Sequence, residues 1–190
     1  MAGIGKADNS GIMGDRETEK FRKAKKERYG RMAKSVKKIM IGSAGEVDPG
    51  FEWVLKGEGY ATEMVDGERC AIIDGVYYKG SGDLNSGVWD EVDFADPKDR
   101  WFVNAYDNTP WCVEDGLYEA VGVHFKGNPY GLDDDFLERH GRIRIRHLPR
   151  SYSGIKEYFR THNVMGIVFW KDGDKRCYVL RTDYGFDWGK

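Results

Sequence analysis

The sequence predicts an α+β domain built on antiparallel β-sheet, with a few helices outside the strands. Two Asp-Gly pairs, Asp74-Gly75 and Asp172-Gly173, each separate runs rich in β-branched and aromatic residues. That pattern is typical of a hairpin closed by a type I′ turn. From residue 51 onward the chain consists of short strand-like runs divided by turn residues, which favours antiparallel pairing.

The N-terminal third differs from the rest in composition. Residues 1–15 are rich in Gly and include a Ser and an Asn, so we expect them to be disordered. Residues 16–41 are strongly basic with sparse apolar positions, which predicts a surface helix with a narrow apolar stripe, interrupted near Gly30. This segment either packs lightly on the domain or contacts an RNA backbone. A loop over 42–50 then leads into the main domain, residues 50–190.

The domain is expected to contain two hairpins, a further strand and a helix. The hairpins cover 69–79 and 164–181, and alternating apolar residues predict another strand over 117–125. Residues 153–162 open with a serine and predict a short capped helix. Alternation over 142–146 would place Arg142, Arg144 and Arg146 on one strand face, where they either follow phosphates or are solvated.

Composition excludes several classes of protein. A chain of 190 residues is expected to form one domain, and a formal net charge of -2 gives no global basic field. The three cysteines (Cys70, Cys112 and Cys177) have no metal-binding spacing, which favours reduced thiols. No apolar run approaches the roughly 18 residues of a membrane span, and no signal peptide is evident. We therefore expect a cytoplasmic monomer that does not enter a membrane.

Common cofactor and metal patterns are missing. The glycine motifs of Rossmann and P-loop sites do not occur. The histidines lack ligand spacing and are interpreted as surface or structural residues: His124, His140, His147 and His162. Three aspartates within 132–141 predict a helix N-terminus in preference to a metal site.

Four segments in order nevertheless resemble one family. The stretch ATEMVDGERC (61–70) resembles motif I of the covalent nucleotidyltransferases, Lys-x-Asp-Gly followed two residues later by Arg. LYEAVG (117–122) resembles motif III, VMGIVFW (164–170) resembles motif IV, and CYVLRTDYGF (177–186) resembles motif V. With flanks such as FEWVLKGEGYATE and HLPRSYSGIKEYF, the chain from about residue 50 to its end resembles a compact branch of the ATP-dependent RNA ligases.

The resemblance implies a fold, a reaction and a set of roles. The fold would be the ATP-grasp-like adenylation domain of RNA and DNA ligases, and the cofactors of the parent family are ATP and magnesium. In such enzymes a lysine attacks the α-phosphate of ATP, AMP passes to an RNA 5′-phosphate, and a 3′-hydroxyl displaces it. By resemblance, the residues expected to contact the nucleotide are Thr62, Glu63, Asp66, Gly67, Arg69, Glu119 and Arg181.

The departures from the family pattern fall on its charged positions. Met64 stands where motif I has its nucleophilic lysine, Met165 where motif IV has a metal-associated glutamate, and Tyr178 where motif V has a lysine. Gly80 stands where an arginine commonly follows, beside Lys79. Each change removes charge, and together they predict an apolar-lined pocket that Met64, Met165 and Tyr178 share. The ligand of this chain is not specified by the sequence.

Three hypotheses remain open at this point. The chain is a ligase-fold protein that lost catalysis, through decay or redesign, and binds a nucleotide or an apolar small molecule in the old cleft. Alternatively it is an inactive variant of a true RNA ligase. In the third hypothesis it is a non-enzymatic RNA-binding module that uses its basic segment and residues 141–150. ATP affinity separates the first two, and salt-dependent RNA binding supports the third.

Overall fold

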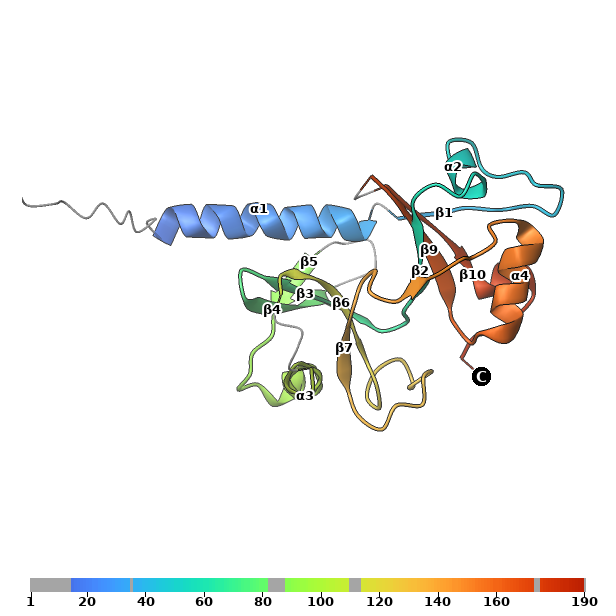
Figure 1. Cartoon of the computed structure of the whole chain (residues 1–190). Helices are drawn as coiled ribbons and strands as arrows, with labels where there is room; N and C mark the ends of the chain where they lie inside the picture. The colour runs from blue at the N-terminus through green and yellow to red at the C-terminus, as the bar shows by residue number, and fades with distance from the viewer. Residues whose placement is uncertain (1–14, 35, 82–87, 110–113, 173–174, 190) are drawn as a thin grey trace, which may run out of the picture.

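Two five-stranded sheets form the framework of the protein. The computed structural model describes residues 15–34, 36–81, 88–109, 114–172 and 175–189 (Figure 1). The two sheets are almost entirely antiparallel, with helices at their flanks, so the predicted α+β class is confirmed.

The first sheet, here called the β3 sheet, has the strand order β5-β4-β3-β6-β7. All of its neighbouring strands are antiparallel. The bounds of its strands are β3 Glu68–Ile73, β4 Val76–Ser81, β5 Val88–Glu91, β6 Gly116–Val121 and β7 Phe136–Arg139.

The second sheet, here called the β9 sheet, has the order β1-β10-β9-β2-β8. Only β1 and β10 run parallel. The bounds are β1 Lys37–Lys38, β2 Tyr60–Met64, β8 Arg144–Ile145, β9 Gly166–Lys171 and β10 Lys175–Leu180.

Both predicted hairpins are present. Between β3 and β4, Asp74 and Gly75 have φ angles of 53° and 73°, as a type I′ turn requires. Between β9 and β10, Asp172 also has a positive φ of 52°, while Gly173 lies outside the described residues. These turns could be predicted from the sequence because left-handed backbone at two successive positions strongly favours Asp-Gly.

The β9 sheet buries one face against helices. Side chains from alternate positions, including Ile167, Phe169 and Val179, form a core with α2 (Glu52–Leu55), α4 (Tyr152–Thr161) and η2 (Arg181–Tyr184). Figure 1 shows α2 and α4 on the side of this sheet that faces away from the β3 sheet. The opposite face, which carries Thr62 and Val168 in register, is turned toward the β3 sheet.

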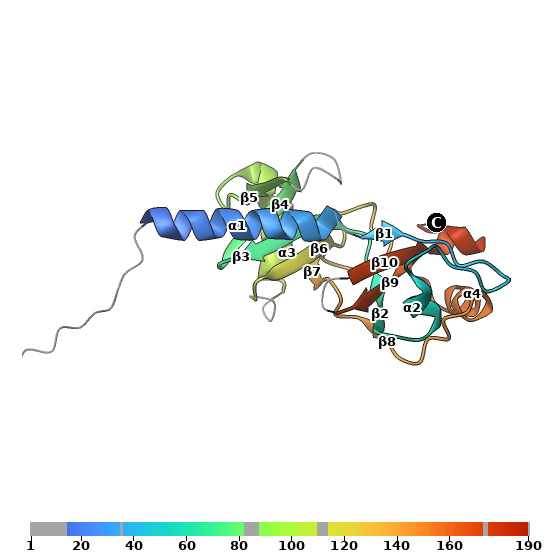
Figure 2. The same ribbon diagram turned by 90° about the horizontal axis from the view of Figure 1, so that it is seen from above.

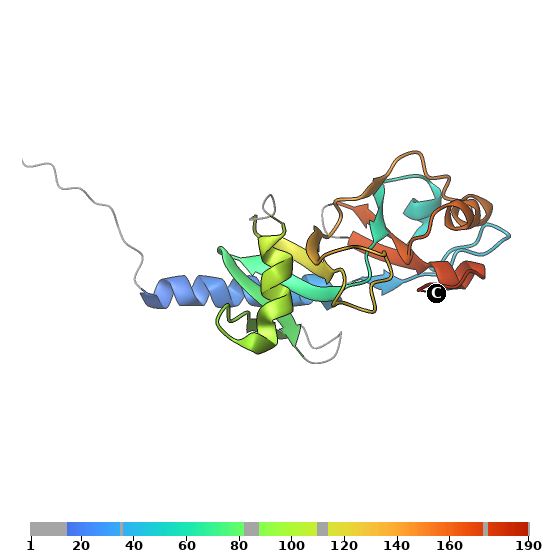
Figure 3. The same cartoon turned by 90° about the horizontal axis from the view of Figure 1, so that it is seen from below.

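The β3 sheet is covered on both faces. One face, with Ile72 and Tyr118, packs against α3 (Arg100–Asp107), which follows the short η1 (Pro97–Asp99). The other, with Tyr78 and Leu117, packs against Tyr29 of α1 (Asp15–Lys34). Figure 3 shows α3 crossing the sheet, and Figure 1 shows α1 on the opposite side.

Helix α1 differs from the predicted surface helix. It runs without a break through Gly30, which is buried, and it ends at Lys34. Lys25 pairs with Asp74 and, at 2.8 Å, with Asp115, so the helix is fixed to the sheet by charge as well as by Tyr29. Packing along the sheet offsets the roughly 1 kcal/mol that glycine costs inside a helix.

The stretch after α1 is extended and belongs to the core. Lys37 and Lys38 pair with Cys177 and Tyr178 of β10, as Figure 2 shows for β1 and β10. Ile39 is 1% exposed and Ile41 3% exposed. The helical prediction for 16–41 is therefore wrong after Lys34, because edge pairing with β10 and burial of the isoleucines favour an extended chain. The predicted disorder of 1–15 falls almost entirely outside the described residues.

Three local predictions need correction. The aspartates of 132–141 do not begin a helix: Asp135 precedes strand β7 and accepts hydrogen bonds from His124. The strand predicted over 117–125 is β6, which ends at Val121. The cap of α4 is Ser151, whose hydroxyl accepts from the Gly154 amide at 3.2 Å, so the helix begins before Ser153.

The C-terminal aromatic residues pack on the domain. Tyr184 is 3% exposed, with ring centroids 5.0 Å from Tyr152 and 5.3 Å from Phe159. The Trp188 indole lies 5.6 Å from the Tyr130 ring, centroid to centroid. The end of the chain therefore holds α4 against the β9 sheet.

Replacing Tyr184 with alanine should lower the free energy of unfolding by about 3–5 kcal/mol, the range for large buried aromatic side chains. Urea unfolding measures the change. Phe94→Ala is the matched control, because Phe94 is 55% exposed, and its loss should be about 1 kcal/mol or less. Equal losses for the two variants would contradict the packing of the C-terminus.

Candidate functional site: the cleft between the two sheets

The chain passes from one sheet to the other at residues 65–67, between β2 and β3. A Cβ atom at Gly67 would lie 2.5 Å from the Ala120 carbonyl oxygen and 2.8 Å from the Glu119 Cβ, so only glycine fits there. Asp66 is held by two aromatic residues: its amide donates to the Tyr130 hydroxyl, and its carboxylate accepts from the Trp188 indole at 2.9 Å. The Asp-Gly pair thus fixes the crossing between the sheets.

A cavity lies beside this crossing. Its volume is about 80 Å³, and Thr62, Met64 and Val168 line it from the β9 sheet. Glu119 and His140 line it from the β3 sheet side. Of the three positions predicted to share an apolar pocket, the structure places Met64 in this cavity.

Glu119 is the most unusual polar group of the cavity. It is 9% exposed, and its Oε1 lies 2.8 Å from Nε2 of His140. Its second oxygen, Oε2, is buried and has no hydrogen-bond partner within the described part of the chain. Burial raises the pKa of Glu119, while the hydrogen bond with His140 acts in the opposite direction. The carboxyl group can therefore accept a hydrogen bond from a ligand, or donate one when it is protonated.

Thr62 supports the wall of the cavity. Its hydroxyl accepts a 2.9 Å hydrogen bond from the Trp170 indole, and it is fully buried. Trp170 also stacks on Tyr60, with ring centroids 5.9 Å apart and planes 5° apart. Thr62 therefore positions the indole, and its side-chain oxygen is already engaged.

Arg69 lies on the same face of the β3 sheet as Glu119, its direct neighbour across β3 and β6. Its guanidinium lies over the Trp89 ring at 5.8 Å. A Cβ atom at Gly80 would approach Arg69 Nε to 3.2 Å, so Arg69 fills the space above Gly80. Lys79 is on the opposite face and pairs with the buried Asp99.

Two of the predicted catalytic positions do not line the cavity. Tyr178 is in register with Val168, so it shares a sheet face with Thr62, but it lies one strand farther away. Met165 precedes β9, and its carbonyl accepts a 2.9 Å hydrogen bond from the Arg181 amide. The expectation that three positions share one pocket is therefore wrong for Met165 and Tyr178: Met165 lies just before β9 begins, and Tyr178 lies on β10 two positions beyond the lining residue Arg176.

Two residues that the resemblance places at the nucleotide, Arg181 and Glu63, have side-chain hydrogen bonds within the protein. Arg181 Nη1 donates to the carbonyls of Phe159 and His162, the latter at 2.7 Å, and so caps the end of α4. Glu63 lines the cavity, and its carboxylate accepts a 2.8 Å hydrogen bond from the Tyr158 hydroxyl.

The sequence analysis did not assign four lining residues to the site, namely Val36, Arg139, Trp170 and Arg176. It interpreted His140 as a surface or structural residue, whereas the structure places His140 in the cavity. His140 lies one residue beyond β7 and meets Glu119 only through the pairing of β6 and β7. Trp170 and Arg176 could have been found from strand alternation, because the register places both on the sheet face of Thr62 and Val168.

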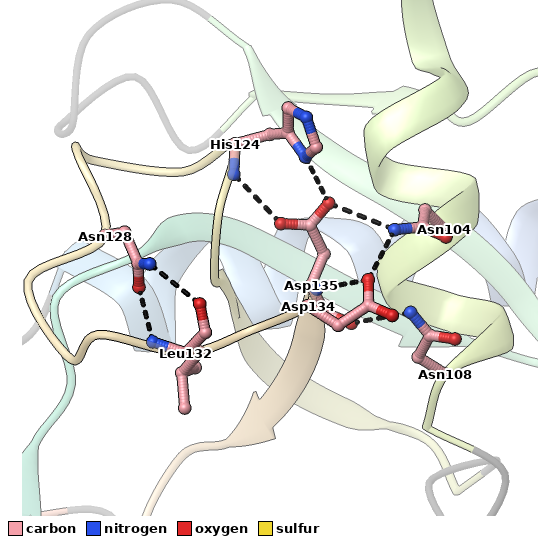
Figure 4. A network of polar contacts seen from close by, with 7 residues as sticks. All are labelled: Asn104, Asn108, His124, Asn128, Leu132, Asp134 and Asp135. Atoms are coloured by element: carbon pink, nitrogen blue, oxygen red, sulfur yellow. Dashed lines mark hydrogen bonds and ion pairs between the residues drawn. The ribbon is translucent and has the colours of Figure 1, made fainter.

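A second polar network lies away from the cleft, on the α3 side (Figure 4). Asp135, which is fully buried, accepts from the His124 amide at 3.0 Å and contacts His124 Nδ1 at 2.7 Å. Asn104 of α3 donates to Asp134 and Asp135, and His124 stacks on Trp101 with ring centroids 3.4 Å apart. The network ties the loop after β6 to α3, which is a structural role.

In comparisons with known proteins, no protein-family model and no curated protein matches the chain. Within the described residues, no cluster of three or more His, Cys, Asp or Glu side chains is arranged to hold a metal ion. The described helices include none that is long and apolar enough to cross a membrane.

The raised pKa of Glu119 has a consequence for stability. Between the ordinary glutamate pKa and the raised one, the folded chain binds more protons at this site than the unfolded chain, so stability falls as pH rises. Glu119→Gln should remove this part of the decline, which amounts to about 1.4 kcal/mol for each unit of pKa shift.

Urea unfolding from pH 4 to pH 8 measures this difference between the native chain and Glu119→Gln. The exposed Glu91→Gln is the control and should retain the native pH profile. Identical profiles for the native chain and Glu119→Gln would contradict the assignment.

Proposed function

We propose that this chain is a non-catalytic member of the ATP-dependent RNA ligase group that binds a small ligand in the cleft between its sheets and forms no lysyl-AMP. The observation that carries the proposal is Met64, which lines the cleft where the resemblance expects the nucleophile. The order of the four sequence motifs supports the relationship, and the two antiparallel sheets are compatible with it.

A methionine cannot perform the first step of ligation. Attack on the α-phosphate needs an amine with a free electron pair, and a thioether does not form the phosphoramidate bond. No lysine is among the described residues that line the cavity beside Glu119. Met64 is also packed: its Sδ would lie 3.2 Å from a Cβ atom at Gly166.

The residues do not fit the magnesium ion that the resemblance implies. Mg²⁺ prefers octahedral oxygen ligands, usually with one or two carboxylates. Glu119 is bound to His140, Glu63 to Tyr158, and Met165 replaces the family's metal-associated glutamate. We therefore assign no metal-dependent step to the described chain.

The remaining polar groups suit recognition of an uncharged hydrogen-bond donor. Glu119 Oε2 is buried and has no hydrogen-bond partner in the described residues, and the apolar Met64 and Val168 line the same cavity. A buried polar atom without a partner costs about 1–3 kcal/mol, and a ligand hydroxyl or amino group would recover part of this. A ribose hydroxyl, the group that the resemblance places at Glu119, has the required chemistry.

Incubation with radiolabelled ATP and magnesium should give no protein-bound label that survives denaturation. Met64→Lys alone should restore little, because the described residues of the cavity do not offer the set of oxygen ligands that magnesium prefers. Adding Met165→Glu and Tyr178→Lys should give little further label, because neither residue lines the cavity beside Glu119.

Returning residue 64 to methionine in the triple variant is the control and should abolish labelling. Robust labelling of the native chain would overturn the proposal. Far stronger labelling of the triple variant than of Met64→Lys would show that Met165 and Tyr178 act on the site although neither lines the cavity.

RNA binding is a second candidate, favoured by an arginine-rich groove at the outer edge of the β9 sheet. Arg142, Arg144 and Arg146 line this groove together with Tyr60. The Arg144 guanidinium lies 4.1 Å from the Tyr60 ring centroid, while Arg142 is bound to Glu138. Cations beside aromatic rings are the usual components of single-strand binding surfaces.

If RNA binds in this groove, Arg144→Gln should weaken affinity about uniformly across sequences and reduce the salt dependence by about one counterion. Filter binding of a short single-stranded RNA between 50 and 200 mM salt measures both quantities. Arg160→Gln is the control, because Arg160 lies on α4 and pairs with Glu157. Equal effects of the two substitutions would exclude the groove as the RNA site.

A further inference from the structure

A second cavity adjoins the first and is lined by arginines. It has a volume of about 270 Å³ and lies between α1 and the two sheets. Arg28 enters from α1, Arg139 from β7 and Arg176 from β10. The two cavities share four residues, namely Arg139, His140, Trp170 and Arg176, so a single ligand can extend from one into the other.

Positive charge dominates the lining. Three arginines and one carboxylate, Asp115, line the cavity, and Glu114, which is not part of the lining, pairs with Arg139. The carboxylate of Asp115 is already engaged, by Lys25 at 2.8 Å and by the Gly75 amide at 3.2 Å. It therefore does little to neutralise the arginines across the cavity.

The three arginines differ in their surroundings. Arg176 is 4% exposed, with its guanidinium 4.9 Å from the Trp170 ring centroid, which holds it against an apolar wall. Arg139 is held by the Glu114 carboxylate and, at 3.3 Å, by the Asp115 carbonyl. Arg28 is exposed and has no ion-pair partner among the described side chains. One arginine is thus fixed by burial, one by hydrogen bonds, and one is available from the helix.

We propose that this cavity binds the phosphate group of a small phosphate ester, such as a mononucleotide. Guanidinium groups match phosphate oxygens with paired N–H donors and stay charged at all relevant pH values. The volume exceeds the roughly 30 Å³ of one water several-fold, so it admits a phosphate with part of its hydration shell. It is below the roughly 300 Å³ at which pockets for drug-sized ligands begin, so the rest of the ligand would extend toward Glu119.

The site is separate from the ligase motif positions. Met64 lines the neighbouring cavity but not this one, and neither Met165 nor Tyr178 lines it. Arg28 and Tyr29 belong to α1, which precedes the region of family resemblance. Phosphate binding by the arginines does not depend on the proposed function. Only the position of the rest of the ligand, near Glu119, rests on the proposed function.

The test measures binding of three probes to the full-length chain by isothermal titration calorimetry: AMP, inorganic phosphate and adenosine. AMP and inorganic phosphate should bind and compete, and adenosine should bind at least tenfold more weakly than AMP. Arg28→Gln should weaken AMP and phosphate about tenfold or more while leaving adenosine unchanged. Arg31→Gln is the matched control, one turn along α1, with its guanidinium paired to Glu27 at 4.0 Å.

Arg28 is exposed, so its substitution should leave the melting temperature unchanged. A loss of binding in this variant would then not be due to misfolding. Arg28→Lys should recover part of the phosphate affinity, because it restores charge without the paired donors. Absence of phosphate and AMP binding at 10 mM, or equal loss in Arg28→Gln and Arg31→Gln, would overturn the phosphate site. Binding of adenosine with no competition by phosphate would also overturn it, while leaving the proposed ligand cleft intact.

Discussion

The arrangement of the whole molecule depends on one close backbone approach, where Gly67 lies against strand β6. A Cβ atom there would come within 2.5 Å of the Ala120 carbonyl oxygen. Because this contact lets the chain leave the β9 sheet and enter the β3 sheet within three residues, it sets the two sheets beside each other. Asp66 reinforces the crossing through Tyr130 and Trp188, so the C-terminus is tied to the same point.

The cleft follows from that crossing. Residues at the end of β2 and in the middle of β6 are brought together, so Met64 and Glu119 share a cavity although far apart in sequence. The strand faces that look inward carry little lysine but several arginines, and α1 closes the arrangement from the side of the β3 sheet. An apolar residue beside a buried carboxylate, with guanidinium groups next to them, favours reversible binding over covalent transfer.

The sequence predicted those parts of the fold that depend on local chemistry. Both Asp-Gly hairpins, the α+β class and the helix at 152–161 could be read from turn and periodicity signals. Ile39 and Ile41 could not be placed, because their burial depends on pairing with β10, well over a hundred residues later. The aspartates near 135 were misread because an acidic run favours a helix start unless a partner such as His124 lies nearby in space.

The site was harder to predict than the fold. Motif positions identified Met64 and Glu119 but not His140 or Arg176, whose relation to them exists only through strand register. Arg181 shows the converse. It lies within a segment that resembles motif V, but in the structure its guanidinium caps the end of α4. A residue's place in a linear motif therefore did not decide which side of the sheet it faced.

An experimental structure of the chain crystallised with ATP and magnesium tests the central claim most directly. We expect an intact or hydrolysed nucleotide held without a covalent bond, with a phosphate beside Arg28 and Arg176 and the sugar toward Glu119. AMP covalently joined to a side chain of the cleft would contradict the account.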